Sequence, residues 1–149
     1  MIFDRTISDV RNAQRIREDK VQKGIALTEA EKSALERGSL SYNTLNRIEL
    51  KQSELAMALT EMGYPVLIVN KRWSAKEIFT ESEFTRIVDN NAKLRKSFFV
   101  YSSTPMDAVP TYRFGEINAL EHILYDLERM IAYAKSKYRR CGMYNCGEG

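Results

Sequence analysis

The residues that could carry chemistry are few and stand apart in the chain. Two cysteines, Cys141 and Cys146, lie close to its end, and the one histidine is His122. Two cysteines supply only half of the ligands of a structural zinc site, and their four-residue gap is wide for a hairpin ligand pair. They also lack the C-x-x-C spacing of a redox motif, although they could close a small disulfide. Such a disulfide would brace the end of the chain and would catalyse nothing.

His122 stands two residues from Leu120 and two from Leu124, so we expect it to point away from their apolar stripe, either into solvent or toward a neighbour that it caps. The sequence contains no Gly-rich phosphate loop, no nucleophile elbow and no paired-histidine helix motif. The scattered carboxylates are interpreted as helix surface, for example Glu54, Glu61 and Asp126. The sequence therefore predicts no catalytic residues, no metal ligands and no cofactor-binding residues: a protein that is not an enzyme.

Length and composition predict one domain, residues 1–149. The chain has 44% hydrophobic and 29% charged residues, which is ordinary globular usage. Its 23 Lys and Arg are interleaved with 20 Asp and Glu, and this small surplus argues against a nucleic-acid partner. The longest wholly apolar run, 65–69, is far shorter than the ~20 residues that span a bilayer, and the start of the chain shows no signal peptide. We expect a soluble protein made in the cytoplasm, with no membrane partner.

The strongest helix signal runs from Ser41 to Gly63. Its apolar residues recur at helical spacing and form one stripe: Leu45, Ile48, Leu55, Leu59 and Met62. Asn43 or Thr44 is expected to cap its start, and Gly63 stands where a left-handed residue commonly ends a helix.

Four capping-box signatures mark further helix starts, at Thr6, Thr28, Ser74 and Thr80, each with an acid three residues on. The first predicts a charged N-terminal helix from Thr6 or Ser8 to about Val21, within a region 1–24. The second predicts a short helix that ends at Gly38 and forms a helical hairpin with the central helix. After Ser74, Ile78 and Phe79 are expected to be buried beside Trp73.

Two long apolar stripes complete the fold. The helix that follows Thr80 is expected to run to about Val100, with Asn91 as an inward amide satisfied by backbone. The last helix spans about Phe114 to Tyr138. Residues 65–69 are predicted as a short strand or extended segment opened by Pro65. With a small hairpin or curled tail at 139–149, the predicted fold class is mainly α, a compact helical bundle.

Several stretches, in order, resemble one protein family. They are FDRTISDV, then TEAE with SLSYNTLNRIE, then GYPV with RWSAKEIFTESEF, then NNAKLRKSF followed by STP, and last INALEHILYDLERMI with a Cys-Gly and Cys-Gly-Glu ending. Together they cover nearly the whole chain. They resemble small domains of tail-associated minor structural proteins, of the tail-fibre or baseplate type, from phages and prophages of Gram-positive bacteria. The family ending has Ser where this chain has Cys141 and Cys146, and an aromatic residue at the position of Tyr138.

This resemblance implies a structural component of a virion or phage-tail-like particle, present in multiple copies and bound to other tail or baseplate proteins. It transfers no catalytic residue. If they are exposed, the aromatic residues expected to anchor such contacts are Trp73, Tyr101, Tyr112 and Tyr144. The alternative is a cytoplasmic helical DNA-binding or regulatory protein. In that case the residues that contact DNA would lie at the start of the central helix: Asn43, Thr44, Asn46 and Arg47.

Overall fold

A computed structural model describes the backbone of residues 1–141 and the side chains of residues 1–137. The helices, in chain order, are α1 (Ile7–Ile16), the π-helical η1 (Arg17–Val21), α2 (Glu29–Gly38), α3 (Tyr42–Glu61), α4 (Glu81–Ser97) and α5 (Phe114–Cys141). No strand occurs within this part of the chain. The mainly α prediction is confirmed. The hairpin or curled tail expected at 139–149 is wrong for residues 139–141, which continue α5, and its remainder lies outside the described residues.

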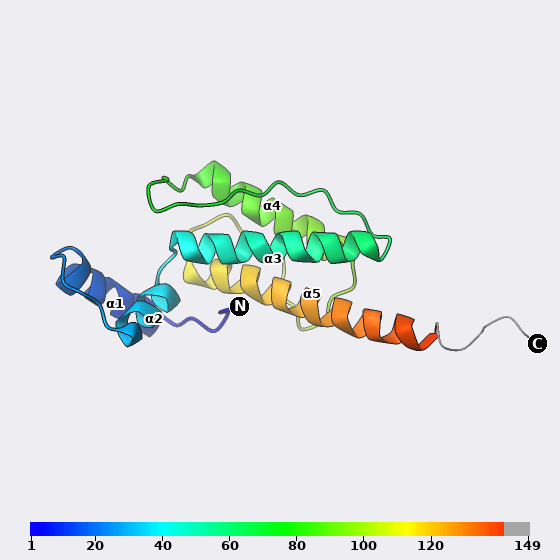
Figure 1. The fold of residues 1–149 in the computed structure, drawn as a ribbon, viewed down its shortest axis with the longest axis horizontal. Coiled ribbons are helices and arrows are strands. Elements are labelled where there is room, and N and C mark those ends of the chain that lie inside the picture. Colours follow the sequence, from blue (N-terminus) through cyan, green and yellow to red (C-terminus); the bar gives the residue numbers. More distant parts are fainter. Residues whose placement is uncertain (142–149) are drawn as a thin grey trace, which may run out of the picture.

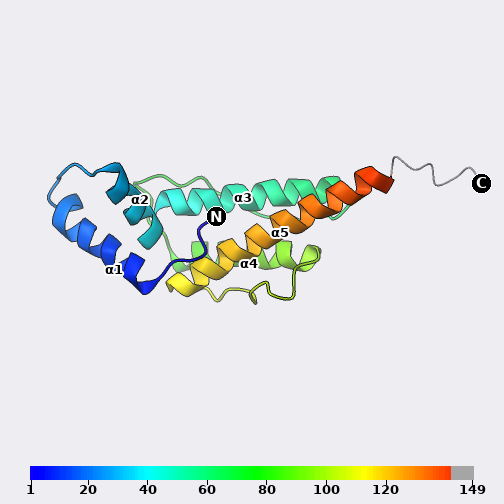
Figure 2. The same cartoon turned by 90° about the horizontal axis from the view of Figure 1, so that it is seen from below.

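The helices form two groups, a small hairpin of α1 and α2 and an elongated three-helix bundle. The hairpin predicted between the short helix and the central helix is therefore wrong in its partner, because α2 packs on α1 and not along α3. Helices α3, α4 and α5 pack against one another, whereas α1 and η1 pack with α2 at one end of the bundle (Figure 1). Figure 2 shows α5 crossing α3 obliquely and extending past it at the other end. The N-terminal segment before α1 returns to the bundle and lies beside α5.

The bundle core is built from the apolar stripes that periodicity predicts. Leu45, Ile48, Leu55 and Leu59 of α3 are buried, and Met62 is partly buried against the same cluster. The facing stripes of α4 and α5 supply Phe84, Ile87, Val88, Leu94, Ile117, Leu120, Ile123, Leu124, Leu127 and Ile131. Burial of each large apolar side chain contributes about 1.5–3 kcal/mol. The core therefore holds all three bundle helices together.

Hydroxyl side chains cap the predicted helix starts. Thr6 and Thr28 form complete capping boxes with Asp9 and Glu31. Thr80 caps α4, but the Glu83 carboxylate does not return to the cap; it pairs with Arg86 at 2.9 Å and with Lys71 at 3.3 Å.

The central helix begins and ends close to its predicted limits. Its cap is Ser41, whose hydroxyl accepts from the Thr44 N–H at 3.3 Å, so the prediction of Asn43 or Thr44 is wrong by two or three residues. Gly63 has φ 89°, the left-handed conformation expected after the helix.

The Ser74 signature does not start a helix. The Glu77 carboxylate accepts from the Ser74 N–H at 2.6 Å, as in a capping box, but only a turn follows. Ile78 is 83% exposed, so the prediction that it is buried is wrong. Phe79 is partly buried, with its ring centroid 5.3 Å from that of Trp73, as expected.

Candidate functional site

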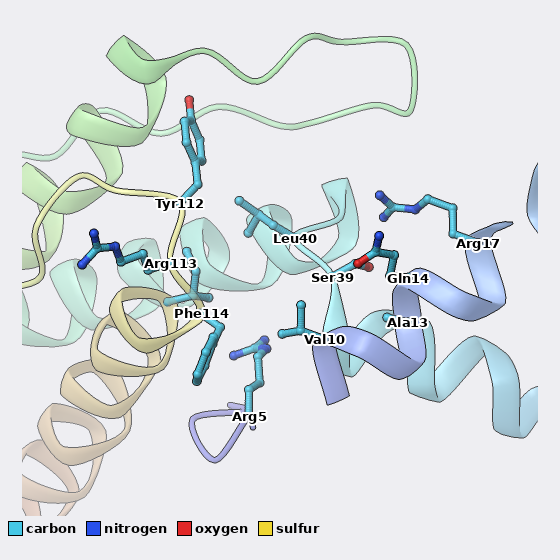
Figure 3. A pocket seen from close by; sticks show the side chains of 12 residues that line it. Arg5, Val10, Ala13, Gln14, Arg17, Ser39, Leu40, Tyr112, Arg113 and Phe114 are labelled. Atoms are coloured by element: carbon cyan, nitrogen blue, oxygen red, sulfur yellow. The ribbon is translucent and has the colours of Figure 1, made fainter. Parts of the chain in front are cut away.

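A groove separates the α1–α2 hairpin from the start of α5, and we call it the junction groove. Its volume is about 550 Å³, within the range of small-molecule pockets. Its lining residues come from the N-terminal segment, the hairpin, the α2–α3 turn and the start of α5: Arg5, Val10, Ala13, Gln14, Arg17, Gly38, Ser39, Leu40, Tyr112, Arg113, Phe114 and Ile117. Figure 3 shows these side chains, with Val10 and Leu40 between the two groups of helices.

Arg5 fixes one end of the groove to the bundle. This arginine is buried, and its Nε donates to the Arg37 carbonyl at 2.9 Å. Its guanidinium also reaches the fully buried carboxylate of Glu121 at 3.3 Å, and Asn118 donates to the Arg5 carbonyl at 2.9 Å. Glu121 accepts as well from Arg47 of α3 at 2.7 Å. The N-terminal segment is therefore tied to α5, α3 and the end of α2 by one charged network.

The hairpin wall is held by close contact between α1 and α2. Arg37 pairs with Asp9 at 3.1 Å, and Gly38 lies directly against the Asp9 carbonyl and the Ala13 side chain. Hydrogen bonds from the Thr6 N–H and hydroxyl, with help from Arg37, hold the pKa of Asp9 below its usual value. Asp9 therefore stays ionised and keeps both the cap of α1 and the contact with α2.

The exposed chemistry of the groove is aromatic and cationic. Tyr112 is 57% exposed although its ring stacks on Phe84, with centroids 5.4 Å apart, and Phe114 is 38% exposed. Arg17 and Arg113 are exposed and make no ion pair with the described residues. Figure 3 shows Arg17 reaching from the hairpin side toward the groove. This arrangement suits an apolar side chain accompanied by a carboxylate.

Of the four aromatic residues predicted as anchors, the structure places only Tyr112 in this groove. Trp73 is buried, with its indole N–H donating to Glu49 at 2.6 Å, so it does not meet the condition of exposure. Tyr101 is 36% exposed elsewhere, with the Arg129 guanidinium 5.7 Å from its ring centroid. Tyr144 and Cys146 lie outside the described residues. Cys141 ends α5, and its side chain also lies outside them, so the predicted disulfide stays a prediction.

The single histidine takes part in packing. The His122 ring stacks on Phe3 with centroids 4.6 Å apart, and its Nε2 lies 3.5 Å from Asp126. Asp126 is buried and accepts from the Thr104 hydroxyl at 2.6 Å, so its interpretation as helix surface is wrong. Glu54 and Glu61 are exposed, as predicted. In the described part of the chain, no three His, Cys, Asp or Glu side chains gather as metal ligands would.

The residues proposed for reading DNA are mostly used inside the fold. Thr44 is fully buried, and Asn46 exchanges hydrogen bonds with the Trp73 backbone at 2.7 and 2.9 Å. Arg47 pairs with Glu36 and Glu121, each at 2.7 Å. Asn43 alone of the four is exposed.

Sequence reasoning missed Arg5, Arg17, Arg113 and Phe114 as groove residues. An arginine in a charged N-terminal stretch normally lies on the surface, and nothing in the spacing of Arg5 marks it for burial. From the sequence, Phe114 marks only the start of the last helix. The signal that could have found this site is the run Tyr112-Arg-Phe114 at a helix start, because aromatic residues and arginine together are typical of interfaces.

Comparison with known protein families, with curated proteins and with solved structures finds no match to this chain. Among the helices described here, none combines the length and the apolar character needed to cross a bilayer.

Proposed function

We propose that this protein is a structural adaptor of a phage tail or phage-tail-like particle, a tail, baseplate or fibre-attachment component that acts through protein–protein contacts. The observation that carries the proposal is the junction groove, where Tyr112 and Phe114 are exposed beside Arg17 and Arg113. Tyr and Arg are prominent among the residues that dominate binding energy at protein interfaces. The resemblance of the sequence to tail-associated domains supports a phage tail as the particle to which the protein belongs.

The interactions that hold the walls of the groove also support an adaptor role. The Arg5–Glu121 network and the Arg37–Asp9 pair fix both walls, so a partner meets surfaces that are already ordered. Ordered surfaces lose less conformational freedom on binding than flexible ones do. In a particle that holds many copies of the protein, individually weak contacts add through multivalency.

The test is incorporation into particles. Tails purified from a host that produces the particle are assayed for the protein by quantitative mass spectrometry, with Tyr112→Ala compared against the wild type. An anchor of hot-spot strength contributes about 2 kcal/mol, so the variant is expected to bind its neighbour roughly 30-fold more weakly and to be depleted from tails. Tyr133→Ala is the matched control, because Tyr133 is 58% exposed on α5 and lies outside the groove.

A second variant separates binding from folding. Tyr112 stacks on Phe84, so its loss also affects packing, whereas Arg17 is exposed and has no partner among the described residues. Arg17→Glu is expected to keep the wild-type melting temperature and still to be depleted from tails. Normal incorporation of both variants would contradict the use of this groove, and absence of the wild-type protein from purified tails would contradict the proposed function.

DNA retention tests the alternative. The purified protein is passed over immobilised duplex DNA at low and at moderate salt. The proposed function predicts no retention at either concentration. Strong retention that falls steeply with salt would instead favour a DNA-binding protein, because release of counterions makes such binding salt-dependent.

A further inference from the structure

The connection between α3 and α4 has the side-chain pattern of a β-strand without a strand partner. Residues 64–73 run back along α3 toward the hairpin end of the bundle (Figure 1). Val66 and Ile68 pack against the core, whereas Leu67 is 89% and Val69 65% exposed. This alternation is the period of an extended strand. It agrees with the extended segment predicted for 65–69, but the segment pairs with no strand in residues 1–141.

One edge of this segment is occupied by side chains of α3 and α4. The Val69 N–H donates to Asn90 at 3.3 Å, and its carbonyl accepts from Asn90 at 2.8 Å and from Arg86 at 2.6 Å. Two residues on, the Lys71 N–H donates to Glu49 at 2.6 Å. Val69 and Lys71 therefore direct backbone groups into the bundle.

The other edge is free. Among the described residues, the backbone N–H and carbonyl of Val66, Ile68 and Asn70 make no hydrogen bond. Successive residues of an extended chain direct their backbone groups to opposite edges, so these three residues present one row of unused donors and acceptors. Pro65, which has no N–H, belongs to the odd-numbered set and removes no donor from this row.

The neighbouring face of α3 is apolar and uncovered. Leu50 is 62% and Met57 66% exposed, and their seven-residue spacing places them two turns apart on one side of the helix. A groove of about 600 Å³ runs between this side and the segment, lined by Asn46, Glu49, Leu50, Ser53, Asn70, Lys71 and Arg72. Lys71 is paired with Glu77 and Glu83, whereas Arg72 is exposed and has no ion pair with the described residues.

We propose that this groove binds an extended segment of a partner protein, which adds as a β-strand to the free edge of residues 66–70. Such strand addition takes affinity from main-chain hydrogen bonds and specificity from pockets for alternate side chains. The apolar side chains of the segment cover Leu50 and Met57, and a carboxylate at its end pairs with Arg72. The proposal goes beyond the structural adaptor and uses none of the residues of the junction groove.

A second copy of this chain does not fit as the added strand. If two copies paired through the free edges of their residues 66–70, each copy would also bring the α3 helix that lies beneath that segment. Paired strands lie about 4.8 Å apart, whereas the axes of packed helices need about 8–10 Å. The two α3 helices would then overlap. The occupant is therefore an extended segment that carries no helix beneath it.

The probe is a synthetic seven-residue peptide of alternating valine and threonine with a terminal glutamate. It is added to the full chain, and hydrogen exchange is followed by NMR. The proposal predicts slower exchange at the Val66 and Ile68 amides and saturable binding. The same peptide, N-methylated at alternate backbone positions, is the matched control, since it keeps the side chains but cannot form the ladder. Absence of protection at millimolar peptide, or equal binding of the methylated peptide, would overturn the proposal.

Two substitutions locate the site. Met57→Lys removes exposed apolar surface from the face of α3 beside the groove and is expected to weaken peptide binding by at least about tenfold. Ile78→Lys, at a residue that is 83% exposed in the 74–80 turn region, is the matched control and is expected to bind as the wild type does. Unchanged binding by Met57→Lys would overturn the proposal. So would dimerisation of the chain that protects the same amides, which would assign the edge to a second copy.

Discussion

The guanidinium of Arg86 meets the carboxylate of Glu49 through two hydrogen bonds, from Nη2 to Oε1 at 2.7 Å and from Nη1 to Oε2 at 2.8 Å. Glu49 lies in the middle of α3 and is only 2% exposed. The same carboxylate accepts from the Trp73 indole and from the Lys71 backbone, each at 2.6 Å. One buried acid therefore joins α3, α4 and the connection between them.

Replacing Glu49 by Ala should strongly destabilise the fold. The substitution leaves the Trp73 indole N–H without its partner and leaves the Arg86 guanidinium with only Glu83 to balance its charge. Breaking a buried ion pair costs about 3–5 kcal/mol. The free energy of unfolding, measured by urea denaturation, is expected to fall by that amount. Glu54→Ala is the control on the same helix, since Glu54 is exposed and pairs only with Lys51; a change of less than about 0.5 kcal/mol is expected. Equal effects would contradict a special role of Glu49.

Replacing Glu121 by Gln should loosen the N-terminal segment and the hairpin. Glu121 is fully buried and pairs with Arg5 at 3.3 Å and with Arg47 at 2.7 Å, so the neutral amide leaves two cations undercompensated. We expect a loss of about 3 kcal/mol, seen by hydrogen exchange mainly in α1 and α2. Glu128→Gln, which affects an exposed pair with Lys51, should leave exchange unchanged. Equal loss of protection in all helices would show that the network does not act as a local anchor.

The sequence predicts well those features that depend only on residues close together in the chain, such as helix caps and apolar stripes. The caps at Thr6 and Thr28 need only an acid three residues on, and the stripe of α3 needs only helical spacing. The Ser74 signature fails because Thr80 caps α4 only six residues later, which leaves no room for another helix. Burial of Arg5, Glu49 and Asp126 was not predictable in this way.

A buried charged residue needs partners from other elements, and those partners are set by the tertiary fold. Arg5 meets Glu121 from the far end of the chain, and Glu49 meets Arg86 across the α3–α4 contact. The same argument applies to the aromatic residues. Trp73 is covered by core contacts, whereas Tyr112 stacks on Phe84 and still exposes more than half of its surface. Residue type alone cannot distinguish these two outcomes.

The cap of α2 should depend on pH through Glu31. Its pKa lies at about 2, well below the ordinary 4.5, because Lys20 and then the Thr28 backbone donate to the ionised carboxylate. A lowered folded-state pKa stabilises the fold above the unfolded value, so this contribution is lost as the pH falls from about 4.5 toward about 2. The carboxyl ¹³C shift of Glu31 should titrate near 2, and α2 amides should exchange faster across this window.

Removal of the Lys20 charge tests whether Lys20 is the main cause of the lowered Glu31 pKa. In Lys20→Met the pKa of Glu31 should rise, because the first of its donors is gone and only the Thr28 donors remain. Lys32→Met is the control, since Lys32 pairs with the exposed Glu29 and does not contact Glu31. An unchanged Glu31 titration in Lys20→Met would contradict the assignment.

Gly38 and Gly115 should respond in opposite directions to replacement by Ala. A Cβ at Gly38 would overlap the Asp9 carbonyl and stand 2.6 Å from the Ala13 Cβ, so α1 must move away from α2. We expect a loss of about 1–3 kcal/mol, with the hairpin amides exchanging faster.

A Cβ at Gly115, in the first turn of α5, meets no atom within 4 Å. There Ala should raise the free energy of unfolding by about 0.5–1 kcal/mol, because it loses less backbone freedom than Gly does. Thermal and urea unfolding of both variants measure the contrast. Equal stability of Gly38→Ala and the wild type would show that α1 does not pack against the end of α2.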